Sequence, residues 1–129
     1  MKVKYSILVV DDEEPARIGL TKIIKNAGYN AKAAKSGKEA LKILEEEPFD
    51  IVITDLKMPT MSGIELLKEI KKRWPEIGVI ILTAYGEVES YLEAMDLGAF
   101  EYLNKPVRIY ELEVIIKKLL EKKGEECQS

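Results

Sequence analysis

Hydrophobic and polar positions along the chain form two kinds of segment. Short runs rich in β-branched residues are typical of buried strands, and hydrophobic residues at every third or fourth position are typical of amphipathic helices. Residues 50–55, DIVITD, show the first pattern, and Met58-Pro59 then takes the chain out of the strand. The second pattern is clearest near the C-terminus, where hydrophobic residues follow helical spacing at Leu112, Ile115, Ile116, Leu119 and Leu120.

Across the whole chain these patterns predict five strands alternating with five helices. The expected strands are residues 5–10, 30–34, 51–55, 79–82 and 100–103. The expected helices are residues 15–27, 36–47, 62–74, 87–97 and 112–120. Serines at 36 and 62, each with a glutamate three residues later, predict capping boxes at two helix starts. We expect one domain over residues 1–123 and a frayed polar tail at residues 124–129.

This alternation, with short connections, predicts a single α/β domain. Strand–helix–strand units with right-handed crossovers produce a parallel sheet that helices cover on both faces. The carboxyl ends of parallel strands share one edge of the sheet, and ligands bind at this edge in open α/β folds. Functional residues are therefore expected directly after the strands.

Polar side chains with complementary chemistry occupy these strand ends. They are Asp11, Asp12, Asp55, Thr83 and Lys105. Carboxylates brought together raise each other's pKa unless a cation neutralises them, and oxygen ligands with open positions suit Mg²⁺. A divalent ion, an ammonium group and a hydroxyl beside a carboxylate make a site for phosphoryl transfer, with the carboxylate as nucleophile.

Each residue also has a plainer interpretation when taken alone. Asp11 and Asp12 could stabilise a helix N-terminus through its dipole. Thr83 could be an ordinary strand residue, Lys105 an exposed loop residue and Tyr102 half-buried packing. The functional interpretation rests on their joint placement at successive strand ends.

The motifs resemble the receiver domain of bacterial two-component response regulators. The resemblance covers about residues 5–120 and rests on the segments ILVVDDE, DIVITDLKMPTMSGIELL, VIILTAYGE and GAFEYLNKP. It implies a three-layer, flavodoxin-like (βα)5 fold with the parallel strand order 2-1-3-4-5. That order places Asp11 and Asp12 next to Asp55.

The resemblance also implies roles for the acidic residues. Asp55 would accept a phosphoryl group from a histidine of a partner kinase or phosphotransferase. Asp12 and Asp55 would ligate Mg²⁺, or Mn²⁺ in its place, together with the backbone carbonyl of Lys57. Asp11 would act on the metal largely through water.

The remaining motif residues would bind the phosphoryl group and transmit its presence. Lys105 would pair with the phosphoryl oxygens, and Thr83 would donate a hydrogen bond to one of them. The peptide bond between Lys105 and Pro106 is expected to be cis. Thr83 and Tyr102 would move inward on phosphorylation, which would change the face of helix 4, strand 5 and helix 5 that a downstream effector reads.

Two bulky residues flank the expected path of an attacking water. Lys57 and Tyr85 each stand two residues after a site residue, and we expect slow self-dephosphorylation. With the segment TAYGE, this pair is similar to stand-alone receivers of sporulation phosphorelays, whereas GAFEYL is similar to receivers of sigma-54-type activators. GAFEYL departs from the GADDYL of winged-helix regulators, and we expect a monomer or weak dimer.

Composition narrows the function classes. The 129 residues carry a net charge of −3, so no overall field favours nucleic acid. The chain has no histidine, which excludes histidine-ligated zinc and a phosphohistidine of its own. One cysteine, Cys127, and no apolar run of membrane-spanning length are typical of a cytoplasmic protein.

Several alternatives differ in the features they require. A phosphatase of the haloacid dehalogenase type would need a D-x-D motif and a cap insertion, and a flavodoxin-like nucleotide binder would need a phosphate loop after the first strand. A receiver that only docks, without phosphorylation, fits the intact acidic set less well. The preferred interpretation is a signalling switch rather than a dedicated enzyme, either a stand-alone receiver or the receiver of a longer transcriptional regulator.

Overall fold

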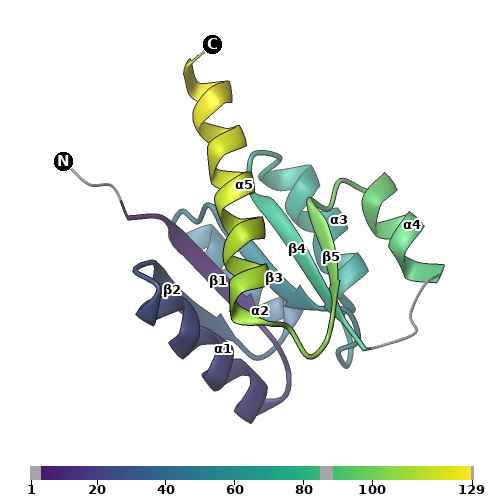
Figure 1. Ribbon diagram of the computed structural model, residues 1–129. Coiled ribbons are helices and arrows are strands. Elements are labelled where there is room, and N and C mark those ends of the chain that lie inside the picture. Colours follow the sequence, from purple (N-terminus) through teal and green to yellow (C-terminus); the bar gives the residue numbers. More distant parts are fainter. Residues whose placement is uncertain (1–3, 85–88, 129) are drawn as a thin grey trace.

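A parallel five-stranded sheet lies between two layers of helices (Figure 1). The computed structural model describes residues 4–84 and 89–128. The strands are β1 (Ser6–Val10), β2 (Asn30–Ala34), β3 (Ile51–Asp55), β4 (Gly78–Thr83) and β5 (Glu101–Asn104). The helices are α1 (Glu14–Asn26), α2 (Gly37–Glu46), α3 (Gly63–Arg73), α4 (Glu89–Asp96) and α5 (Ile109–Gln128). The predicted α/β architecture is confirmed.

The strand order explains where the site lies. The sheet has the order β2-β1-β3-β4-β5, and every neighbouring pair is parallel, as predicted. From β1 the chain turns to one side to form β2 and then returns to the other side to form β3. The residues that follow β1 and β3 therefore lie side by side, since Val10 pairs with Thr54.

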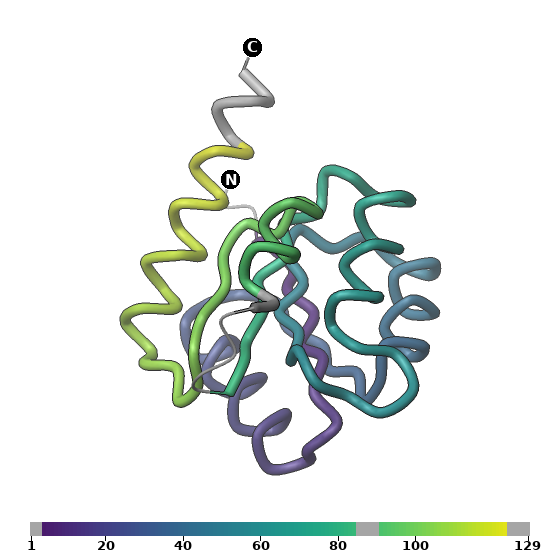
Figure 2. The backbone as a smooth tube through the Cα atoms, turned by 90° about the vertical axis from the view of Figure 1, so that its right-hand side faces the viewer, coloured from purple at the N-terminus to yellow at the C-terminus, as the bar shows by residue number. Residues whose placement is uncertain are grey.

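Alternating side chains divide the core between the two faces of the sheet. Ile7 and Val9 of β1 pack with α1 and α5, whereas Leu8 and Val10 pack with α2, α3 and α4. Figures 1 and 2 show the same layers from two directions, with α1 and α5 on one side of the sheet. Because both faces are covered, β1, β3 and β4 consist almost entirely of buried residues.

The helix starts follow the capping signals in part. Ser62 and Glu65 form the complete capping box that the sequence predicts at α3. At α2, Ser36 accepts a hydrogen bond from the backbone N–H of Glu39, but the Glu39 carboxylate accepts one from Lys35 N–H instead of Ser36 N–H. The second predicted box is therefore only half formed.

The C-terminal end differs from the prediction. Residues 124–128 continue α5 as a helix, where a frayed tail was expected. Lysine, glutamate and glutamine are good helix formers, and they extend the helix beyond its last core residue, Leu120. Among the described helices, none combines the length and the apolar character needed to cross a membrane.

Candidate functional site

An ion-paired carboxylate lies at the carboxyl end of β3. Asp55 is the last residue of this fully buried strand and is 9% exposed. Its Oδ1 lies 2.9 Å from Nζ of Lys105, and the same ammonium lies 3.3 Å from Oδ2 of Asp11. The fold therefore brings together the ends of β1, β3 and β5, as the sequence predicts.

A third carboxylate completes the cluster. Oxygens of Asp11, Asp12 and Asp55 all lie within 4.8 Å of one another. Asp11 is buried and Asp12 is exposed, so the cluster opens to solvent on one side. Hard carboxylate oxygens at this spacing, with one side open to water, fit the ligand requirements of Mg²⁺.

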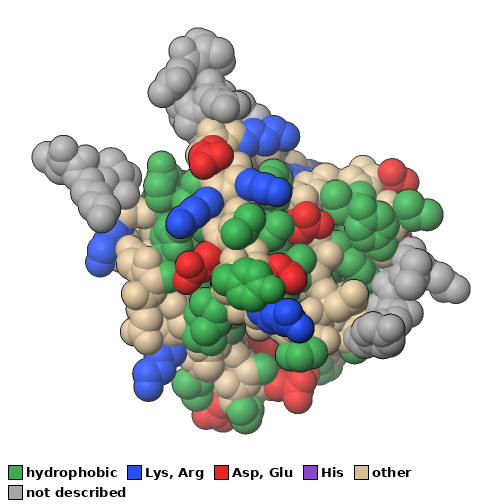
Figure 3. Space-filling model, viewed as in Figure 1, with side chains coloured by type: hydrophobic (Ala, Val, Ile, Leu, Met, Phe, Trp, Pro, Cys, Tyr) green, Lys and Arg blue, Asp and Glu red, His purple; other side chains and the backbone are tan. Residues whose placement is uncertain are grey.

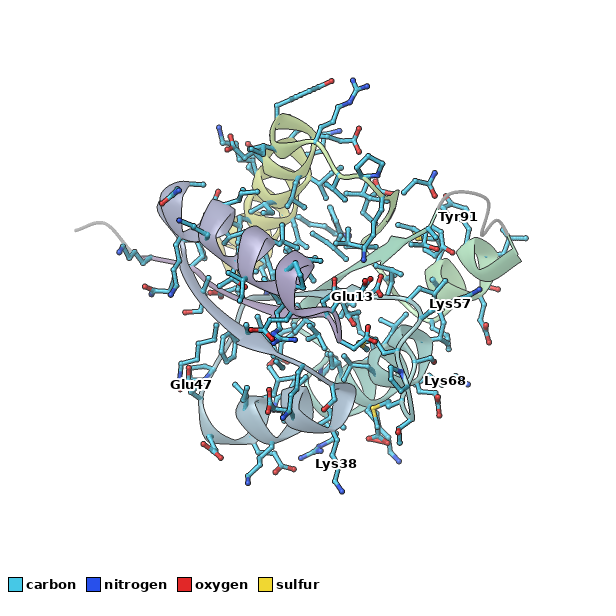
Figure 4. The ribbon with its side chains drawn as sticks, turned by 90° about the horizontal axis from the view of Figure 1, so that it is seen from below. Glu13, Lys38, Glu47, Lys57, Lys68 and Tyr91 are labelled. Carbon is cyan, nitrogen blue, oxygen red and sulfur yellow. The ribbon has the colours of Figure 1, made fainter. Side chains whose placement is uncertain are left out.

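Residues of the β1–α1 loop and of α1 fix the position of Asp11. Its Oδ1 accepts a hydrogen bond of 3.0 Å from the backbone N–H of Glu13. Nη1 of Arg17 donates a hydrogen bond of 3.0 Å to the backbone carbonyl of Asp11. Both Asp11 oxygens thus have protein partners, Glu13 N–H and Lys105. Figure 4 looks onto this edge of the sheet, with Glu13 near its middle.

Thr83 lies at the end of β4, also as predicted. It is 1% exposed, and its Oγ1 donates a hydrogen bond of 3.3 Å to the carbonyl of Ala84. Its own carbonyl accepts a hydrogen bond of 2.7 Å from the backbone N–H of Lys105, which ties the β5–α5 connection to β4. The peptide bond between Lys105 and Pro106 is cis, which confirms that prediction.

Tyr102 has an aromatic partner that the sequence analysis did not identify. Its ring meets the ring of Tyr91 of α4 edge-to-face, with centroids 5.5 Å apart and planes at 87°. Tyr102 is half-buried and Tyr91 is 41% exposed. The contact joins β5 to α4 and is favourable for aromatic pairs. An aromatic residue on the exposed side of a predicted helix was the only available signal.

Of the two residues expected to flank an attacking water, the structure describes one. Lys57 is exposed in the loop after β3, and Figure 4 shows it on the α4 side of the edge. Tyr85 lies outside the described residues. Glu13 and Arg17 are further site neighbours that sequence reasoning missed.

Burial and charge act in opposite directions on the central ion pair. Burial raises the pKa of the Asp55 carboxyl, and the charges of Asp11 and Asp12 add to this rise, although Lys105 lowers it in part. Burial lowers the pKa of the Lys105 ammonium, but its contacts with Asp55 and Asp11 outweigh burial and leave that pKa raised. Lys105 is therefore a permanent cation at neutral pH, placed where negative charge gathers.

A cleft beside the ion pair gives access to it. The cleft has a volume of about 540 Å³ and lies between α1 and the β5–α5 connection. Asp11 and Lys105 line one end, and the remaining lining is mostly hydrophobic, including Leu20 and Val107. The cleft therefore leads along α1 to the acidic edge.

Comparisons with known proteins identify the same kind of domain. The model of the response regulator receiver domain family matches residues 7–117. A receiver domain protein of Clostridium thermocellum superimposes with a TM-score of 0.89 at 40% identity, covering 93% of this chain and 97% of that one. The receiver domain of NtrX from Brucella abortus superimposes with a TM-score of 0.85 at 30% identity, covering 89% and 98%.

Two curated relatives differ in how much of their own length the match covers. Sporulation initiation phosphotransferase F of Bacillus subtilis is 42% identical over 114 residues, which cover 88% of this chain and 92% of that protein. The transcriptional regulatory protein ZraR of Escherichia coli is 43% identical over 114 residues, which also cover 88% of this chain. The match spans only 26% of ZraR, about a quarter of that regulator. With the receiver model matching most of its length, this chain belongs to the response regulator receiver domain family.

Proposed function

We propose that Asp55 accepts a phosphoryl group from a phosphohistidine of a partner kinase or phosphotransferase. One observation carries the proposal: the carboxylate lies 2.9 Å from the Lys105 ammonium, within a cluster of three carboxylates at the open edge of the sheet. An Asp55 oxygen forms the new O–P bond while the P–N bond breaks, and the imidazole keeps the electron pair and takes a proton. The product is an aspartyl phosphate.

The nearby residues stabilise the charge that this transfer moves. Lys105 neutralises phosphoryl oxygens, and the Thr83 hydroxyl donates a hydrogen bond to one of them. Asp12, Asp55 and the Lys57 carbonyl would hold Mg²⁺, with Mn²⁺ able to take its place. Asp11 would act through water. The metal supplies charge neutralisation and orientation of the phosphoryl oxygens when bound.

The output is a change of the α4–β5–α5 face. Phosphorylation adds negative charge and acceptor oxygens beside Thr83, whose carbonyl is hydrogen-bonded to the β5–α5 connection. A movement of Thr83 toward the phosphoryl group opens space for Tyr102, which would leave its contact with Tyr91 and turn inward. The downstream effector reads this difference in packing.

The phosphoryl group is retained for long periods. Lys57 is exposed in the loop after β3, and Tyr85 stands two residues after Thr83 in the sequence. Both residues are bulky, so self-dephosphorylation is slow. The chain catalyses its own phosphorylation and dephosphorylation but serves as a signalling switch, not as a dedicated enzyme.

Residues 1–123 form the receiver unit, and residues 124–129 are a polar C-terminal tail, of which residues 124–128 continue α5. The chain works in the cytoplasm as a monomer or weak dimer, without direct binding to nucleic acid. Figure 3 supports the last point on the face it shows, where positive and negative side chains are mixed around hydrophobic ones over α5. Ile109, Tyr110 and Val114 are among the exposed hydrophobic residues of this helix.

Intact mass after incubation with acetyl phosphate tests the proposal. We expect the mass of one phosphoryl group to be added in the presence of Mg²⁺, and not in EDTA. Asp55→Asn should remove the addition. Asp50→Asn is the matched control, because Asp50 directly precedes β3 at the end opposite Asp55 and accepts a hydrogen bond from Ser6 N–H. No addition to the unchanged chain, under conditions that modify another receiver, would favour a docking domain without phosphorylation.

A further inference from the structure

The loop between β3 and α3 contains a strained turn. Thr60 has a φ of +70°, which side chains other than glycine, asparagine and aspartate rarely adopt. The backbone N–H of Met61 donates a hydrogen bond of 2.9 Å to the carbonyl of Pro59, across Thr60. A bond between residues two apart, around a positive φ, is the geometry of a γ-turn, which is strained even without a β-branched side chain.

Contacts at both ends of the loop hold this turn in place. The backbone N–H of Gly63 donates a hydrogen bond of 2.7 Å to the carbonyl of Leu56. A Cβ at Gly63 would lie 2.4 Å from the backbone oxygen of Asp55, so α3 begins directly against the acceptor residue. Backbone strain persists only where surrounding structure fixes it, so a partner outside the loop is required.

Met61 supplies that partner contact by packing on the first residue of α2. A Cβ at Gly37 would lie 2.7 Å from Sδ of Met61, 2.9 Å from its Cγ and 3.1 Å from its Cβ. The Met61 side chain therefore lies along the backbone of Gly37, which is buried. Only glycine allows this approach.

The contact between Met61 and Gly37, called the clamp below, lies a few residues along the loop from the backbone carbonyl of Lys57, which is a proposed metal ligand. Lys57 stands between Leu56 and Met58, which are 4% and 9% exposed and anchor the loop in the core. Lys57 itself is exposed, and the loop continues from it through Met58 and Pro59 to the turn at Thr60.

We propose that Met61, clamped against Gly37, is a positioning residue that fixes the Lys57 carbonyl for the metal ion. This inference rests on the proposed function, because it assumes that the acidic cluster binds Mg²⁺. It links α2, which contributes no ligand, to the geometry of the site. Thr60 keeps its strained conformation because the contact of Met61 with Gly37 prevents the loop from relaxing.

Calorimetric titration with Mg²⁺, without any phosphodonor, tests the clamp. In Gly37→Ala the new methyl group displaces Met61, and we expect the dissociation constant for Mg²⁺ to rise about tenfold, as for other residues that orient ligands. Met61→Ala should raise it similarly. The double variant should bind no more weakly than Met61→Ala, because the displaced side chain is gone.

Gly19→Ala is the matched control, since a Cβ there meets nothing within 4 Å in α1. It should bind Mg²⁺ like the unchanged chain. Circular dichroism establishes that each variant is folded; if Gly37→Ala does not fold, Met61→Ala alone decides. Folded variants with the dissociation constant of the unchanged chain would overturn the clamp while leaving the metal site intact. No binding by the unchanged chain would overturn the metal site and the clamp together.

Discussion

Oδ1 of Asp55 and Nζ of Lys105 lie 2.9 Å apart although fifty residues separate them in sequence. Despite this contact, the pKa of the Asp55 carboxyl is raised above its ordinary value, because burial and the two neighbouring aspartates outweigh the ammonium. Relative to the protonated form, the ionised form of the Asp55 carboxyl is therefore less favourable in the folded chain than in the unfolded chain. The geometry that creates a reactive carboxylate reduces the stability of the fold.

Asp55→Asn should therefore raise the melting temperature at neutral pH in EDTA, by a few degrees. Because the pKa of Asp55 is raised in the folded chain, the contribution of this carboxyl to the free energy of unfolding is complete below the ordinary pKa of aspartate. It is lost as the pH rises through the pKa of the folded chain. The pKa of Lys105 is also raised, so its contribution persists through the neutral range. Melting curves from about pH 4 to pH 8 should show the gain of Asp55→Asn shrinking toward acid. A gain independent of pH would contradict this account.

Mg²⁺ should stabilise the folded chain through the exposed carboxylate of the cluster. At a concentration about 100 times the dissociation constant, a ligand that binds only the folded state adds about 2.7 kcal/mol to the free energy of unfolding. Urea denaturation with and without Mg²⁺ measures this gain. Asp12→Asn should lose most of it, whereas Glu14→Gln, in the same acidic run but outside the cluster, should keep it. Equal gains in both variants would exclude Asp12 as a ligand.

Two glycine substitutions should have opposite effects on stability. Gly63→Ala places a methyl group 2.4 Å from the Asp55 carbonyl oxygen, so we expect the free energy of unfolding to fall by about 1–3 kcal/mol. Gly19→Ala places one in open space within α1, and we expect a gain of about 1 kcal/mol from helix propensity. Chemical denaturation distinguishes the two. A stabilised Gly63→Ala would show that α3 does not begin against Asp55.

Alanine variants are usually more stable than glycine variants at the same position, and the strain at Thr60 should reverse this order. Thr60→Gly can adopt the positive φ freely, whereas Thr60→Ala retains the strain. We expect Thr60→Gly to be the more stable of the two by about 1 kcal/mol, measured by urea denaturation. At Glu46, exposed near the end of α2, alanine should instead be the more stable. The same order at both positions would mean that Thr60 is unstrained.

Sequence pattern predicted the elements that carry the site. The run that ends at Asp55 identified β3, and the alternation of strands and helices placed Asp11, Thr83 and Lys105 at one edge. This worked because strands buried on both faces have a distinct apolar pattern and because parallel strands end on the same side. The strand order itself came from the family resemblance rather than from the pattern.

Other features depend on contacts that no local pattern encodes. The sequence shows that the chain leaves the strand at Met58-Pro59 and that a helix begins at Ser62, but it does not show the positive φ of Thr60 or the contact of Met61 with Gly37 of α2. The pairing of Tyr91 with Tyr102 likewise joins two segments that packing alone brings together. The extension of α5 to Gln128 was missed because a hydrophobic period ends where burial ends, whereas helical backbone can continue beyond it.

The wide sequence separation of the site residues has a consequence for synthesis of the chain. Asp11, Asp12 and Asp55 leave the ribosome well before Lys105, so an incomplete chain holds the carboxylates without their ammonium partner. In the folded chain the lysine is held beside them by the pairing of β5 with β4 and by the hydrogen bond from its backbone N–H to the carbonyl of Thr83. Nascent or truncated chains that lack this last strand should not accept a phosphoryl group from the phosphodonor. Only finished molecules then compete for the signal.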